Sequence, residues 1–195
     1  MYVRRQRSGP RVMAGITAFL EPRLKLKVHA EKSAVARPWQ RKFLGYRVWW
    51  HEKPKLKIAP SSRQRFAEKI GPTLRGARGQ SLRQVIDQLN PVLRGWVAYF
   101  RLTEERGVWE ELDGWIRRKL RTILWRHWKR PLTRTQHLLR MGIEAVRARQ
   151  SATHGRGPWW NGGAAHLPAT FPQSCFDRMG LLSLLATQRR FSLVS

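Results

Sequence analysis

The chain has 195 residues, enough for one or two small domains, and its 39 lysine and arginine residues against 12 acidic residues give a net charge of +27. Because 42% of the residues are hydrophobic and ten are tryptophan, the composition supports a folded core and excludes wholesale disorder, so the excess charge indicates a polyanionic partner. Arginine, which forks onto phosphates and stacks on bases, outnumbers lysine, and no apolar run approaches the roughly 20 residues that span a bilayer. We therefore expect a soluble, cytoplasmic protein that binds nucleic acid and has no membrane partner.

The first 59 residues predict a small mixed α/β unit. Residues 11–21, "RVMAGITAFLE", carry apolar side chains at helical spacing, and Pro22 is expected to end this helix. From Leu24 the letters "LKLKV" alternate as in a strand, and after a turn-like "HAEKSA" the residues from Phe43 to Trp50 predict a second strand. One helix and two strands bury little surface, so this unit lacks a complementary second layer in its own sequence.

A helical region of about 70 residues follows the connector "EKPKLKIAPSS", residues 52–62. Four helices are predicted: one capped by Ser62 and ending near Leu74, one capped by Ser81 and kinked at Pro91, one from about Glu104 to Trp128, and one capped by Thr133 and ending near Gly142. The predicted fold class is therefore mainly α. A helical bundle at residues 60–145 is preceded by the α/β unit at 1–59 and followed by a Gly/Pro/aromatic loop and tail at 146–195.

The third predicted helix separates apolar from basic residues. At 100° per residue one arc collects the expected core positions Trp109, Leu112, Ile116, Leu120, Ile123 and Leu124. The opposite arc collects cations and indoles at Arg117, Arg118, Arg121, Lys129, Trp125 and Trp128. Indole beside guanidinium suits a helix that lies against an RNA backbone and unstacked bases. The alternative is a solvated basic face whose tryptophans pack on a neighbouring element.

Side chains suited to metal binding or covalent chemistry are sparse. Cys175 is the single cysteine and is expected to be a buried structural thiol, and the six histidines show no metal-ligand spacing. The glycines of "GRGPWWNGG", residues 155–163, lack the strand–loop–helix context of a nucleotide loop. They predict a rigid aromatic turn in which Arg156 is a candidate RNA contact. We expect no metal site and no cofactor.

Several blocks of the chain, in order, resemble a known family. The stretch "EKSAVARPWQRKFLGYRV" resembles the end of the palm of group II intron reverse transcriptases, with "KFLG" at the centre of the match. The later blocks "SLRQVIDQLNPVLRGWVAYFR", "WEELDGWIRRKLRTILWRHWK" and "GRGPWWNGG" resemble the maturase-specific thumb, or domain X, of the same family. "FDRMGLLSLL" is similar to the tail of some bacterial members.

The resemblance implies roles for individual residues. The "FLG" strand would pack at the primer-grip end of a polymerase, with its aromatics and Leu44 buried and Gly45 allowing close backbone approach. Arg41 and Lys42 would then face nucleic acid, unless they serve only to protect a strand edge from aggregation. Within the thumb blocks, Arg94 is a further candidate RNA contact.

One departure from the family bears on catalysis. The family's metal-binding Tyr-Ala-Asp-Asp box would precede Tyr2, and the acidic residues before position 60 are Glu21, Glu31 and Glu52, which form no carboxylate pair. A two-metal phosphoryl transfer needs such carboxylates to hold its ions. We therefore expect this chain not to be an enzyme by itself.

Three functional hypotheses remain open. The first is an RNA-binding maturase fragment that binds structured group II intron RNA while the RNA performs splicing. The second is the C-terminal part of a split or truncated RNA-directed DNA polymerase, whose partner would be the missing fingers-palm part. The third is a non-functional remnant of such a polymerase.

Overall fold

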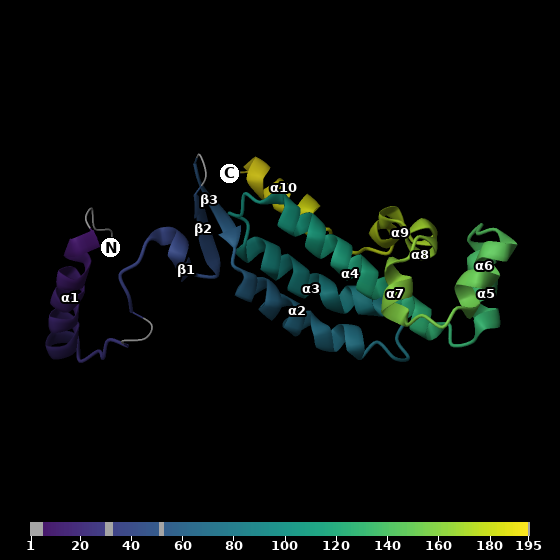
Figure 1. Ribbon diagram of the computed structural model, residues 1–195, viewed down its shortest axis with the longest axis horizontal. Coiled ribbons are helices and arrows are strands. Elements are labelled where there is room, and N and C mark those ends of the chain that lie inside the picture. The colour runs from purple at the N-terminus through teal and green to yellow at the C-terminus, as the bar shows by residue number, and fades with distance from the viewer. Residues whose placement is uncertain (1–5, 30–32, 51–52, 195) are drawn as a thin grey trace.

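The computed structural model describes residues 6–29, 33–50 and 53–194. Over these residues the molecule is elongated and built almost entirely from helices, with one small sheet near its N-terminal end (Figure 1), which confirms the mainly α fold class. The elements, in chain order, are η1 Gln6–Ser8, α1 Gly9–Leu24, η2 Pro38–Gln40, β1 Lys42–Phe43, β2 Tyr46–Trp50, β3 Pro54–Ile58, α2 Pro60–Arg75, α3 Leu82–Tyr99, α4 Arg106–His127, α5 Pro131–Arg140, α6 Ala145–Thr153, α7 Pro158–Gly163, α8 His166–Thr170, α9 Gln173–Arg178 and α10 Leu184–Val194.

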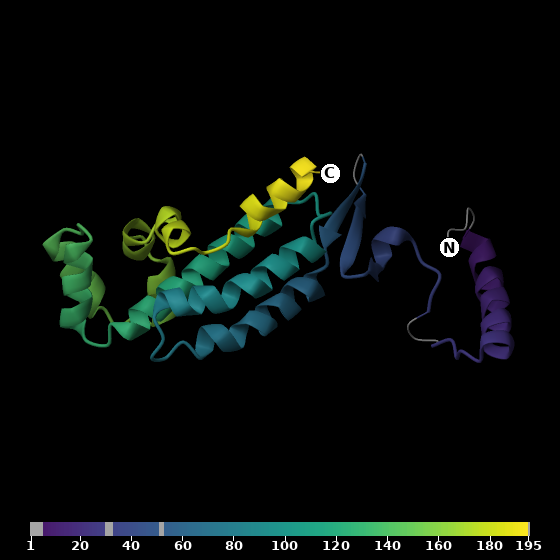
Figure 2. The same cartoon turned by 180° about the vertical axis from the view of Figure 1, so that it is seen from behind.

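Helix α1 stands apart from the helical bundle, as Figures 1 and 2 both show. It continues past Pro22 to Leu24, because proline removes one backbone donor near the helix end without leaving helical φ. The strand expected from Leu24 is absent from the described residues: Lys25 has a left-handed φ of 51°, and no neighbouring strand pairs with the segment to residue 29. Residues 30–32 of the expected turn lie outside the described residues.

The sheet contains a strand that sequence reasoning assigned to the connector. β1, β2 and β3 form an antiparallel sheet in that order, and Val48 pairs with Leu56 in its register. The expectation of an irregular connector at residues 52–62 is therefore wrong for Pro54–Ile58. Its apolar and lysine residues alternate with the period of two that an antiparallel strand requires.

The turn between β1 and β2 docks against α3. Gly45 has a φ of 80°, and a Cβ there would lie 3.0 Å from Ser62 Oγ and 3.1 Å from the Phe100 ring, so the predicted close approach at this glycine is confirmed. The Tyr46 hydroxyl donates to the Tyr99 carbonyl at 2.7 Å, and the Tyr99 hydroxyl donates to the carbonyl preceding Gly45 at 3.0 Å. These reciprocal bonds attach the sheet to the bundle.

Helix capping was predicted correctly at one position and wrongly at two. Ser81 caps α3 in a capping box, in which its Oγ accepts from the Gln84 amide at 3.3 Å. Ser62 and Thr133 lie inside α2 and α5, because both helices begin with proline, whose fixed φ suits the first helical position. Ser62 is instead buried and donates to the Gly45 carbonyl at 3.1 Å.

A continuous hydrophobic core extends from Ile58 to Leu184. The expected inward face of α3 is confirmed, since the following side chains are buried in it: Leu82, Val85, Ile86, Leu89, Leu93, Val97 and Phe100. Helix α7 packs against α4, and α10 packs against α3 and α4. The core therefore crosses the expected boundary between residues 145 and 146, and Cys175 packs against it while remaining partly exposed.

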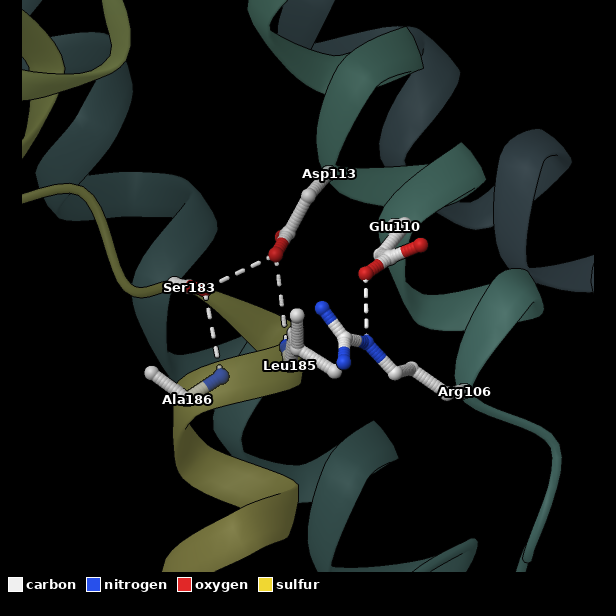
Figure 3. A network of polar contacts seen from close by, with 6 residues as sticks. All are labelled: Arg106, Glu110, Asp113, Ser183, Leu185 and Ala186. Carbon is white, nitrogen blue, oxygen red and sulfur yellow. Dashed lines mark hydrogen bonds and ion pairs between the residues drawn. The ribbon is translucent and has the colours of Figure 1, made fainter.

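Polar side chains of the bundle hold the start of α10 (Figure 3). The buried carboxylate of Asp113, on α4, accepts from the Ser183 hydroxyl at 2.8 Å and from the Leu184 and Leu185 amides at 2.9 and 3.2 Å. Ser183 Oγ accepts from the next amide, that of Ala186, at 3.2 Å. The first amides of α10 thus find acceptors, and a negative charge lies at the positive end of its dipole.

Candidate nucleic-acid interface

The apolar arc predicted for the third helix forms the core side of α4. Trp109, Leu112, Ile116, Leu120 and Ile123 are buried, and Leu124 is partly buried against them. The prediction of this face is confirmed, because helical spacing alone brings these side chains into one stripe.

The opposite arc is not an open surface, and Arg121 shows why. Its side chain is only 8% exposed, and Nε and Nη2 donate to the Phe171 carbonyl at 3.0 and 2.8 Å. Burial, together with the charge of Arg117, lowers the pKa of Arg121 to about 10, so the guanidinium remains charged at neutral pH. Arg121 is therefore internal and does not lie on an open basic face, since the residue that follows α8 covers it. Its contact with RNA stays a prediction, which this burial disfavours.

The indoles expected on this arc are also buried. Trp125 is 1% exposed and Trp128 is 7% exposed. The Arg134 guanidinium lies 4.6 Å from the centre of the Trp125 ring, and His137 stacks on Trp128 at 4.6 Å. This burial disfavours the expected stacking of Trp125 on RNA bases, which stays a prediction. The alternative holds for both tryptophans, which pack on neighbouring elements.

Residues 158–163 form helix α7, which packs closely against α4, so the expected aromatic turn is wrong. A Cβ at Gly162 would lie 2.6 Å from Thr122 Oγ1 and 2.8 Å from the Arg118 carbonyl, and only glycine permits this approach. The Arg118 side chain donates through Nε and Nη2 to the Trp159 carbonyl, both at 3.2 Å. Arg118 thus holds α7 in place and is partly buried.

A groove opens where α2, α4 and α7 meet. It has a volume of about 440 Å³, and its lining includes Trp115 and Trp159 together with the cations Arg75, Lys119 and Arg126. Trp159 is 40% exposed, and Lys119 Nζ lies 4.6 Å from the centre of its ring. The groove thus combines accessible indole with positive charge.

The electrostatics of this groove favour an anion. Burial, and then the charges of Arg126, Arg75 and Arg118, lower the pKa of Lys119. Glu68 is the acidic residue in the lining, and it accepts a hydrogen bond from Gln64 at 2.9 Å. The cations therefore repel one another, and a bound anion would relieve that repulsion.

The remaining predicted contacts lie at separate places on the surface. Arg94, on α3, and Lys129, just after α4, are exposed, and Arg117 is partly exposed. Arg156 is exposed with its guanidinium 4.2 Å from the centre of the Trp160 ring. These four residues stay predictions, since nothing in their geometry excludes contact with RNA.

The hairpin at residues 41–50 differs from its expected environment. Arg41 and Lys42 are exposed, and Lys42 Nζ donates to Ser61 Oγ at 3.2 Å, so their predicted role in RNA binding remains open. Phe43 is 76% exposed and Leu44 is 65% exposed, and the expectation that they are buried is wrong. The element that packs on β2 is η2, whose Trp39 ring lies 6.1 Å from that of Trp50.

Sequence reasoning missed the groove residues Arg75, Trp115, Lys119, Arg126 and Trp159. A signal existed on α4, because Trp115, Lys119 and Arg126 recur at helical spacing between the core arc and the expected basic arc. The contributions of α2 and α7 carried no such signal, since a groove between three helices depends on how they pack.

Two of the three helices that form this groove, α2 and α4, lie in a known type of domain, whereas α7 lies outside it. Residues 63–142, from the first turn of α2 to the glycine that follows α5, match the model of the group II intron, maturase-specific domain. The match confirms the resemblance to group II intron maturases over these residues. No curated protein matches the chain. In the described part of the chain, no helix is long and apolar enough to cross a membrane, and no three His, Cys, Asp or Glu side chains gather as metal ligands.

Proposed function

We propose that the protein binds structured group II intron RNA and stabilises its active fold, while the RNA performs the splicing chemistry. The uncompensated charge of the maturase-specific domain carries this proposal. Among the described residues three ion pairs form, Lys57–Glu105, Arg63–Glu111 and Arg106–Glu110, and their glutamates lie in or next to the first turns of α4. From Trp115 to His127 the same helix carries cations and no carboxylate. An RNA backbone would supply the missing anions.

The test is a titration of the full chain with a structured group II intron RNA and with an unstructured RNA of equal length, between about 50 and 300 mM salt. If roughly 6 to 10 phosphates are neutralised, the logarithm of affinity should fall with that of salt with a slope of about −5 to −9. The structured RNA should bind more tightly at every salt concentration. A flat salt dependence, or equal binding of both RNAs, would overturn the proposal.

A splicing assay tests the second half of the proposal. At a magnesium concentration too low for efficient self-splicing, the protein should increase the splicing rate of the intron that it binds. Unchanged splicing at saturating protein would limit the function to RNA binding.

We further propose that this chain alone performs no nucleotide polymerisation, because the acidic residues before position 60 form no pair that could hold two ions. The full chain should show no primer extension on an RNA template with Mg²⁺ or Mn²⁺. Extension that survives controls for a contaminating polymerase would refute this.

The second candidate is the C-terminal part of a split reverse transcriptase, and the exposed sheet favours it. Phe43 and Trp50 lie on the same face of the sheet, because Phe43 pairs with Tyr46 and alternate residues of β2 share a face. They are 76% and 58% exposed, which is typical of an apolar face that a further protein surface covers. A separately expressed fingers-palm chain should then bind this protein and gain primer-extension activity. A Trp50→Glu variant should abolish both effects, and retention of both would exclude this face as the contact.

A further inference from the structure

Arg118 contacts both the backbone carbonyl and the ring of Trp159. The Arg118 guanidinium lies 4.0 Å from the centre of the Trp159 ring while its two nitrogen donors bind the Trp159 carbonyl. The close packing of Gly162 on α4 holds the rest of α7. Because the Arg118 guanidinium contacts the indole and α7 packs on α4, the indole loses little further conformational freedom when a ligand binds, which favours affinity.

Lys119 links the two indoles of the groove. Its Nζ lies 4.6 Å from the Trp159 ring centre and 5.4 Å from the Trp115 ring centre. Arg75 and Arg126 line the same groove from α2 and α4. Planar apolar surface and three cations therefore converge in one place. Within the part of the chain that the structure describes, no carboxylate forms an ion pair with any of these cations.

The groove has the size and chemistry for one nucleotide. Its volume of about 440 Å³ is within the range of roughly 300–1,000 Å³ that small-ligand sites occupy. A base needs an aromatic face to stack on, and the adjoining phosphates need cations. A purely apolar ligand would cover the cations without supplying a counter-charge. A bare phosphate would make no contact with the indole rings.

We propose that the groove between α2, α4 and α7 is a subsite for a single unstacked nucleotide of RNA, with the base against Trp159 and Trp115 and the flanking phosphates on Lys119, Arg75 and Arg126. This inference rests on the proposed function and assigns a specific contact within it. The site would bind an unpaired base by stacking on its planar face, which all bases have, so it would accept different bases. It would favour single-stranded loops or bulges over regular duplex, in which the bases are already stacked.

The test compares two RNA probes on the full chain. One is a ten-nucleotide single strand with 2-aminopurine at its centre, and the other has the same backbone with abasic residues. Trp159→Ala should weaken binding of the first probe by about 5- to 100-fold, the usual range for losing one stacked base, and leave the abasic probe unaffected. Trp159→Phe should restore most of the affinity and the quenching of 2-aminopurine.

Trp49→Ala is the matched control. Trp49 is 47% exposed and has Lys57 Nζ 4.8 Å from its ring centre, so it resembles Trp159 in exposure and in its cation but lies on the sheet. Its loss should not change binding of either probe. Lys119→Ala should weaken both probes and lower the salt slope by about 0.7, the value for one phosphate of a single strand.

Two results would overturn the subsite. The first is equal binding of the 2-aminopurine probe by Trp159→Ala and Trp49→Ala. The second is a loss of affinity in Trp159→Ala that is equal for the 2-aminopurine probe and the abasic probe. Thermal melting of each variant separates loss of binding from loss of fold, and Trp159→Phe keeps the test open if the alanine variant unfolds. If the unmodified chain binds RNA with the expected salt slope but the variants bind both probes as tightly as it does, the subsite is refuted and the proposed function stands.

Discussion

Replacing Arg121 by alanine tests whether this arginine serves the fold or the RNA. The side chain contributes two hydrogen bonds to the Phe171 carbonyl, and bonds of this kind that involve a charged group are worth about 1.5–3 kcal/mol each. Against this, the fall in the pKa of Arg121 from 12.5 to about 10 is equivalent to about 3 kcal/mol of lost preference for the charged form. The alanine variant relieves that penalty but leaves a cavity and an unpaired carbonyl.

These opposing effects predict a net loss of about 1–3 kcal/mol in the free energy of unfolding, since the unpaired carbonyl and the cavity remain. Urea unfolding monitored by circular dichroism measures it. The salt slope of RNA binding should stay unchanged at temperatures where the variant is folded, because a guanidinium that is 8% exposed has no surface to offer a phosphate.

Arg117→Ala is the control, one helical turn earlier on α4. Arg117 is partly exposed and its charge repels Arg121, so its removal should leave stability unchanged or slightly raised. Its loss should lower the salt slope by about 0.9 if it contacts one phosphate of a duplex region. If Arg121→Ala instead unfolds like the unmodified protein and lowers the salt slope as Arg117→Ala does, Arg121 faces RNA and the reasoning from burial is wrong.

Three further predictions concern packing, the C-terminal helix and pH. Gly162→Ala should lower the free energy of unfolding by about 1–3 kcal/mol, because the added Cβ overpacks against Thr122. Gly155→Ala is the control and should be close to neutral, since a Cβ there would meet nothing within 4 Å. Equal melting temperatures of the two variants would refute the close approach of α7 to α4. Asp113→Ala should loosen the attachment of α10 to α4, because three hydrogen-bond donors at the start of α10 lose their acceptor. Amide hydrogen exchange in residues 184–194 should accelerate. Unchanged exchange would contradict the role of Asp113 in holding this helix. Burial, and then the charges of His154 and Arg147, lower the pKa of His166 in the folded protein, so on acidification this histidine is protonated in the unfolded chain before it is protonated in the folded one. The free energy of unfolding should therefore fall as pH drops below about 6.5 and level off below the folded pKa. In urea titrations, the stability of His166→Phe should depend less on pH than that of the unmodified chain.

The sequence by itself determined the features that depend only on residues close to one another along the chain. The cap at Ser81 and the buried stripe of α4 follow from spacing within one helix, and the structure confirms both. The ordered blocks that resemble a maturase thumb also required no tertiary contact, and the match over residues 63–142 confirms that resemblance. Local chemistry failed where two signals competed, as at Ser62, because the preceding Pro60 offered a better start for the helix.

Only the tertiary structure decided which side of α4 faces solvent. Helical periodicity separates two arcs of a helix but does not say whether a later segment covers the polar one. Arg121 binds a carbonyl 50 residues away, and Trp125 is enclosed by Arg134 and His166, so both became internal when the chain folded back. The groove likewise joins Arg75 on α2, Lys119 on α4 and Trp159 on α7, and no local pattern encodes a site whose walls come from three separate helices.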